Sequence, residues 1–264
     1  MAKHDTAIIL FIADIVGKPG YEVLSTYLPS LKKQYNVDFT IANGENGAQG
    51  KGLTEQLAKK YYSLGIDVLT GGNHSWTYAA FRRYLDQSDR VLRPANYPRE
   101  APGKGAALYK TESGLSIGVV NLQGRTFMYQ IDCPFKRGLE EVERLRQHTS
   151  VIFMDVHAEA TAEKLALGWY LDGKASAVVG THTHVQTADE RILPHGTAYI
   201  TDVGMTGPND SVIGLDVEVA IKRFIRGIPE HYQMATANIR LNGVVVEVDV
   251  QTGRAKSITR INLP

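Results

Sequence analysis

The chain has 264 residues, of which 43% are hydrophobic and 22% are charged, a composition typical of a globular protein with a substantial core. Its formal net charge of +1 gives no indication of a stable nucleic-acid partner or of an anionic membrane. The single cysteine, Cys133, cannot form an internal disulfide, so the fold does not depend on an oxidising compartment. The apolar run at 7–13 is far shorter than the roughly 20 residues of a membrane span, and no signal-peptide cleavage site follows it. We therefore expect a cytoplasmic protein without a membrane partner.

The first two thirds of the chain alternate short apolar runs with stretches of helical spacing. The expected strands are 7–13, 39–42, 68–70, 117–122, 151–156 and 177–179. The expected helices are 21–35, 55–64, 78–85 and 160–170. Thr54 is expected to cap the second helix, and Pro29 to kink or split the first. Alternation of this kind predicts βαβ units, and continuous apolar strands predict burial on both faces of a sheet.

The C-terminal third contains strand-like segments with few helices between them. We expect strands at 197–202, 234–240, 244–250 and 257–261, and one helix near 216–225. The turn residues at 251–253 predict an antiparallel hairpin between the last two strands. No linker divides the chain. The prediction is therefore one α/β domain over residues 1–264, with two mixed β-sheets packed face to face and helices outside them.

Polar side chains that commonly bind metals occur where the predicted strands end. They are Asp14, Glu45, Asn46, Asn73, His74, His157, His182 and His184. In open α/β sheets, ligands bind at the carboxyl ends of the strands, so these side chains are expected to meet at one edge. A lone Asp after a strand is more often a turn residue. Four histidines in such positions, among eight in the chain, make that explanation weak for the set as a whole.

The chemistry of this set favours transition metals. Carboxylate, amide and imidazole ligands suit Mn, Fe, Zn or Co better than Ca or Mg. One metal takes about four protein ligands, so the longer set indicates two metals that share a carboxylate. Two-metal sites stabilise the attacking and leaving oxygens of phosphoryl transfer. In the pair His182 and His184, the alternation of an extended segment is expected to place both imidazoles on the same side.

Other polar residues have two interpretations each. Arg125 is a candidate phosphate clamp because of its planar donor geometry, and equally a solvated loop residue. Asp155 could orient a metal ligand from behind, although a strand-end cap is the favoured interpretation. The glycine-rich segment 43–52 is neither a P-loop nor a dinucleotide fingerprint, and its glycines are expected to let the backbone approach the metal site.

These motifs, in this order, resemble those of the calcineurin-like metallophosphoesterases, and most closely the bacterial YmdB-like branch, regarded as cyclic-nucleotide phosphodiesterases. The resemblance extends to residues 14–20 and 201–208 and covers most of the chain. The sequence departs from the broad superfamily in two places. The usual Asp-x-His is here Asp14-Ile15-Val16, and the usual Gly-Asp is here Gly44-Glu45-Asn46.

The resemblance implies a four-layer metallophosphoesterase sandwich and two divalent or trivalent metal ions, with iron or manganese first and zinc or cobalt next. The first ion would take Asp14, Glu45, Asn46 and His184. The second ion would take Glu45, Asn73, His157 and His182. A metal-bridging hydroxide would attack the phosphorus of a 2′,3′- or 3′,5′-cyclic nucleotide, and His74 would serve as the general acid.

Two other functions remain open from the sequence. A phosphomonoesterase or nucleotidase could use the same metals, and a regulatory protein could bind a nucleotide without hydrolysing it. An amidohydrolase is disfavoured, because its His-x-His pair typically occurs early in the chain. A homo-oligomer is a further hypothesis, with contacts through the C-terminal hairpin or through the loop at 204–208.

Overall fold

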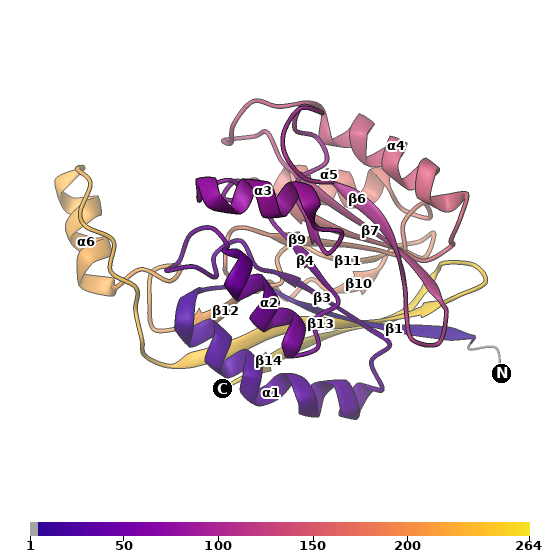
Figure 1. The fold of residues 1–264 in the computed structure, drawn as a ribbon, viewed down its shortest axis with the longest axis horizontal. Helices are drawn as coiled ribbons and strands as arrows, with labels where there is room; N and C mark the ends of the chain where they lie inside the picture. The colour runs from indigo at the N-terminus through magenta and orange to yellow at the C-terminus, as the bar shows by residue number, and fades with distance from the viewer. Residues whose placement is uncertain (1–4) are drawn as a thin grey trace.

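The computed structural model describes residues 5–264 and contains two mixed β-sheets (Figure 1). In the first sheet the parallel strands are β1 (Thr6–Ile12), β3 (Phe39–Asn43), β4 (Val68–Thr70) and β5 (Val91–Leu92). On the other side of β1 lie β13 (Ile239–Asp249), β14 (Ala255–Leu263), β12 (Met205–Pro208) and β2 (Asp14–Ile15). The C-terminal hairpin therefore pairs with the first strand of the chain, antiparallel to it.

The second sheet is built from the middle of the chain. Its parallel strands are β7 (Ser116–Gln123), β8 (Ile152–His157), β9 (Ala177–Thr181) and β11 (Ala198–Ile200). Its antiparallel edge strands are β6 (Ala106–Lys110) and β10 (Arg191–Ile192). Both sheets thus contain a parallel set with its carboxyl ends free to carry loops.

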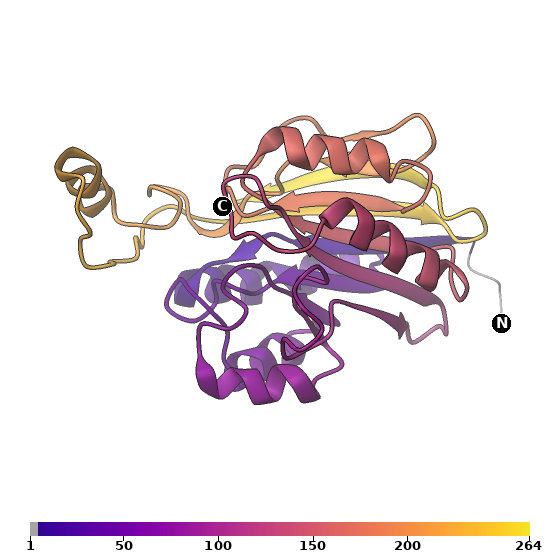
Figure 2. The same cartoon turned by 90° about the horizontal axis from the view of Figure 1, so that it is seen from above.

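The main core lies between the two sheets, where Phe11 of β1 stacks on Phe153 of β8 with ring centroids 5.4 Å apart. Side chains alternate along β1, so Phe11 faces this core while Leu10 faces the helices. The first sheet is covered by α1 (Gly17–Tyr35), α2 (Glu55–Ser63) and α3 (Ala79–Gln87). The second is covered by α4 (Pro134–Arg146) and α5 (Thr161–Tyr170) (Figure 2). This is the predicted four-layer arrangement, and the predicted fold class is confirmed.

Several element boundaries differ from the prediction. Helix α1 begins at Gly17 and continues through Pro29 without a break. Pro29 is exposed, so water can bind the carbonyl that its missing N–H leaves free. The predicted cap is present, since the Thr54 hydroxyl accepts from Leu57 N at 3.3 Å. The short strands β2, β5, β6, β10 and β12 were not predicted from the sequence.

Residues 209–236 form a projection that we call the arm. It carries α6 (Val217–Arg226), which stands apart from both sheets in Figures 1 and 2. Asp216 caps this helix, and at its base Asp216 N donates to Gln233 O at 2.8 Å. The expected strand at 234–240 is therefore partly wrong, because Met234 pairs with Leu215 inside the arm and β13 begins only at Ile239.

The loop suggested as an oligomer contact is also different from the expectation. Residues 203–208 are all buried, and Met205 to Pro208 form β12 between β2 and β13. This segment could contact another subunit only if the residues that cover it moved away. Over residues 5–264, no helix combines the length and the apolar character needed to cross a membrane.

Candidate metal centre

The loops at the carboxyl ends of β1, β3, β4, β8 and β9 bring the predicted ligands together. The side chains of Asp14, Glu45, Asn46 and His157 are buried, with exposed fractions between 0% and 4%. His182 and His184 are less buried and border a cavity. The strand-end pattern therefore collects these residues at one edge of the sandwich, as the sequence predicted.

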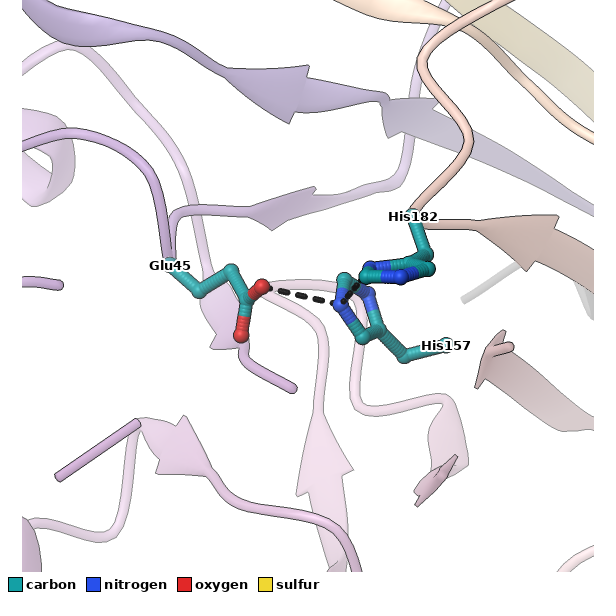
Figure 3. Close-up of side chains that lie close together, drawn as sticks. All are labelled: Glu45, His157 and His182. Atoms are coloured by element: carbon teal, nitrogen blue, oxygen red, sulfur yellow. Dashed lines mark hydrogen bonds and ion pairs between the residues drawn. The ribbon is translucent and has the colours of Figure 1, made fainter. Parts of the chain in front are cut away.

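The larger group centres on His157 (Figure 3). Its Nε2 atom lies 2.8 Å from Glu45 Oε1, 3.0 Å from Asn73 Oδ1 and 3.0 Å from His182 Nδ1. Ligand atoms of Glu45, His157 and His182 all lie within 4.8 Å of one another, a spacing that a single metal ion can bridge. Together with Asn73, these three residues are the set that the resemblance implies for the second metal.

A second group contains Asp14, Asn46 and His184. Asn46 Nδ2 is 3.4 Å from Asp14 Oδ1 and 3.3 Å from His184 Nε2, and His184 Nε2 is 3.8 Å from Asp14 Oδ2. The Asn46 amide donates to these atoms here. Rotation of the amide by a half turn would present its oxygen instead, as a metal ligand requires. This is the set implied for the first metal.

The outer partner of each histidine fixes its tautomer. His184 Nδ1 lies 3.1 Å from the carbonyl of Ile213, and His182 Nε2 lies 3.1 Å from a carboxylate oxygen of Glu159. Both partners only accept, so these nitrogens carry the protons. His157 Nδ1 lies 2.9 Å from the Thr181 hydroxyl, which donates its own proton to Asp155. All three imidazoles therefore turn a lone pair towards the centre of the site.

This arrangement fits metal ions. The inward nitrogens of His157 and His182, 3.0 Å apart, both present lone pairs and neither can donate to the other. Glu45 Oε1 is buried and has no hydrogen-bond partner among the described residues, although it lies 2.8 Å from His157 Nε2. Such convergence of electron-rich atoms is unfavourable unless a cation lies between them.

The pKa shifts of the buried carboxylates and imidazoles also fit a metal site. Burial, with the negative charge of Glu45 nearby, raises the pKa of Asp14 well above its ordinary value, and burial also raises the pKa of Glu45. Burial lowers the pKa of His157 well below its ordinary value and that of His182 to about 3. The imidazoles are therefore neutral, as metal ligands must be, and cations would favour the charged carboxylates.

Asp155 orients His157 through Thr181 and does not cap a strand end, which was the favoured prediction. Its Oδ1 accepts from Thr181 at 2.7 Å, and its Oδ2 accepts from Thr70 at 2.5 Å and from Asn43 at 3.0 Å. The carboxyl group thus ties β8 to the ends of β3, β4 and β9. The alternation of apolar residues in β8 could not reveal this, because all its side chains are buried.

The loop that carries His182 and His184 is not extended, which corrects the expected geometry. Strand β9 ends at Thr181, and the φ angles of His182 and His184 are 95° and 65°, in the left-handed region. The two rings consequently reach separate groups of ligands. The strain of this turn is held by a buried ion pair, Lys164 Nζ to Asp202 Oδ2 at 2.7 Å. Asp202 Oδ2 also accepts from Thr183 N at 3.1 Å.

We expect Lys164→Met to destabilise the metal-free protein by about 3–5 kcal/mol, because it leaves the buried Asp202 carboxylate without its cation. Adding Asp202→Asn should recover part of the loss. Urea unfolding measures both, with Lys60→Met on the exposed face of α2 as the matched control. A loss below about 1 kcal/mol for Lys164→Met would contradict the role of this ion pair.

A cavity of about 370 Å³ opens over the site. Glu45, Asn46, His74, His182 and His184 line one side of it. The His74 backbone N–H donates to Glu45 Oε2 at 3.0 Å, so His74 is fixed beside the predicted bridging carboxylate. His74 therefore lines the cavity directly beside Glu45.

Arg125 is not brought into this cavity. It follows β7, next to His157, and its backbone N–H donates to Glu163 at 3.0 Å. Among the described residues its guanidinium forms no hydrogen bond or ion pair with the site residues, so a phosphate clamp remains a prediction. Glu159, Thr181, Lys164 and Asp202 hold the histidines and were not predicted as site residues. Asp202 lies in the segment 201–208 and Thr181 precedes His182, but only the fold shows which part of the site each of them supports.

The chain is similar to known proteins over nearly its whole length. A family model described as YmdB-like protein matches residues 10–261. The chain is 52% identical, over 253 residues and 96% of each chain, to the 2′,3′-cyclic-nucleotide 2′-phosphodiesterase of Bacillus subtilis (strain 168).

Solved structures show the same fold. A phosphatase from Mycoplasma pneumoniae is 34% identical with a TM-score of 0.92, covering 98% of this chain and 93% of that chain. A hypothetical protein from Thermus thermophilus is 40% identical with a TM-score of 0.87, covering 97% of this chain and 100% of that chain.

A sandwich of two mixed sheets, with carboxylates and imidazoles gathered at its strand ends, is the architecture of the metallophosphoesterase class of hydrolases. Within that class, the chain belongs to the YmdB-like family. The predicted family and the prediction of a hydrolase enzyme are confirmed.

Proposed function

We propose that this protein is a dinuclear metal-dependent phosphodiesterase that hydrolyses 2′,3′-cyclic nucleotides. The observation that carries the proposal is the convergence of three imidazole lone pairs on the carboxylates of Glu45 and Asp14, with no proton available between His157 and His182. The 52% identity to a 2′,3′-cyclic-nucleotide 2′-phosphodiesterase favours this substrate over 3′,5′-cyclic nucleotides.

In this proposal one metal ion would be held by Asp14, Asn46 and His184, and the other by Asn73, His157 and His182. Glu45 would contribute to both. When bound, two such ions supply a water of lowered pKa and neutralise the charge on the phosphate oxygens. The donor set includes three imidazole nitrogens, which favours iron, manganese, zinc or cobalt over magnesium or calcium.

The remaining chemistry falls to His74. Hydrolysis breaks the bond between phosphorus and the ribose 2′ oxygen, which leaves as a poorly stabilised alkoxide unless it receives a proton. His74 lines the cavity next to Glu45, so its imidazole, when protonated, can donate that proton as the general acid. The ribose then keeps a phosphate on its 3′ oxygen.

The test is elemental analysis of the purified protein together with product analysis for three substrate types. We expect about two transition-metal ions per chain, in line with dinuclear sites. We also expect turnover of 2′,3′-cyclic AMP to 3′-AMP, with much slower turnover of 3′,5′-cyclic AMP and of 3′-AMP itself. Faster release of phosphate from 3′-AMP than ring opening would favour a phosphomonoesterase. Tight nucleotide binding without turnover would favour a regulatory protein.

A further inference from the structure

The cavity over the metal site has a second wall, and the predicted catalytic residues do not contribute to it. This wall comes from the arm and consists of Val212, Ile213, Leu215, Phe224 and Tyr232, with Arg223 beside them. Four of these six side chains are purely apolar. The cavity is therefore polar at the metal ligands and mainly apolar on the opposite side.

The arm is fixed to the metal site at two points. The Ile213 carbonyl accepts from His184 Nδ1 at 3.1 Å, and Ile213 has a φ of 48°, which is unusual for a β-branched residue. Gly50, with a φ of 86°, passes so close to Tyr232 that a Cβ atom there would lie 2.3 Å from the tyrosine oxygen. The arm wall is thus held at a defined position relative to the ligands.

Two side chains on this wall are exposed although they are apolar. Phe224 is 79% exposed and Ile213 is 57% exposed. Apolar groups that line a cavity and remain uncovered gain free energy when an apolar surface of a ligand covers them. Arg223 and Lys51 also line the cavity. Among the described residues neither of them forms an ion pair, so both cations are free to attract an anion.

We infer that the arm is the nucleoside-binding half of the site and that Phe224 stacks on the base of the substrate. This inference rests on the proposed function. A cyclic nucleotide has an anionic phosphate at one end and a flat base with apolar faces at the other, which matches the two walls of the cavity.

The apolar character of the arm wall also bears on which bases can bind. Its apolar members cannot hydrogen-bond to the base edges, and stacking on an aromatic ring is open to every base. Stacking on Phe224 therefore does not by itself select among the four bases, and purines gain more from it than pyrimidines because they stack over a larger area.

The test compares 2′,3′-cyclic AMP with a base-free analogue, methyl riboside 2,3-cyclic phosphate. In the wild type, KM is lower for the nucleotide because the base contributes to binding. We expect Phe224→Ala to reduce this KM advantage about tenfold, in the range of a lost base–aromatic stack. Phe224→Tyr should retain it.

Ile225→Ala is the matched control, because Ile225 is adjacent, on the same helix, 80% exposed and outside the cavity lining. An unchanged KM ratio in Phe224→Ala, or the same change in Ile225→Ala, would overturn the inference. If the wild type hydrolyses neither substrate, the proposed function fails. In that case calorimetry tests the role of the arm without turnover. It measures the binding of 3′-AMP and of ribose 3-phosphate to the wild type and to Phe224→Ala.

Discussion

Glu45→Ala is expected to lose both metal ions and to lower kcat/KM for 2′,3′-cyclic AMP by about 10³-fold or more, since one charge-stabilising group alone is commonly worth 10²–10³-fold. The physical reason is the shared position of this carboxylate. Its Oε1 lies 2.8 Å from His157 Nε2, and it is the anionic ligand proposed for both ions. Elemental analysis and steady-state kinetics on the same preparation measure the two effects.

Thermal unfolding gives a readout that is independent of activity. Added manganese should raise the Tm of the wild type, because a ligand that binds only the folded state stabilises it. The Tm of Glu45→Ala should not respond to the metal. Without metal, the variant should be at least as stable as the wild type, since burial raises the pKa of Glu45 and so makes its charged form costly.

Glu141→Gln is the control for the loss of a buried glutamate. Glu141 is 6% exposed, lies on α4 and pairs with Arg137 and Arg144 away from the metal site. It should keep two metal ions and full activity. Metal content near two in Glu45→Ala would show that Glu45 does not bridge the ions, and the ligand assignment would have to be revised.

The loss of activity in His74→Ala is expected to depend on the leaving group of the substrate. For 2′,3′-cyclic AMP, kcat should fall by about 10²–10³-fold, within the usual contribution of a general acid. For bis(p-nitrophenyl) phosphate the fall should be less than about tenfold, because nitrophenolate is stable without a proton. The metal content should stay unchanged, since His74 is not among the proposed ligands.

The control for this variant is His148→Ala, an exposed histidine after α4. Both substrates should behave as with the wild type. Equal losses of activity with the two substrates in His74→Ala would mean that His74 supports the site structurally. Loss of metal would mean that it acts as a ligand. Either result would remove its assignment as the general acid.

The sequence by itself predicted the residues of the candidate site and their place in the fold. Buried parallel strands show as continuous apolar runs, and the chain must turn where each run ends, so polar residues at those points share one edge. This is why Glu45, His157 and His182 could be predicted as neighbours although the positions are 25 to 137 residues apart. The same runs predicted the α/β layers.

The tertiary structure alone decided how the histidines are held. Their tautomers depend on Glu159, Thr181 and the Ile213 carbonyl, and the strained turn depends on the ion pair of Lys164 and Asp202. Those partners come from distant segments, and no local period connects them. The arm is a similar case, because a helix with exposed apolar side chains has no sequence signal that places it over a metal site. Local patterns fix what one segment buries, whereas contacts between segments depend on packing of the whole chain.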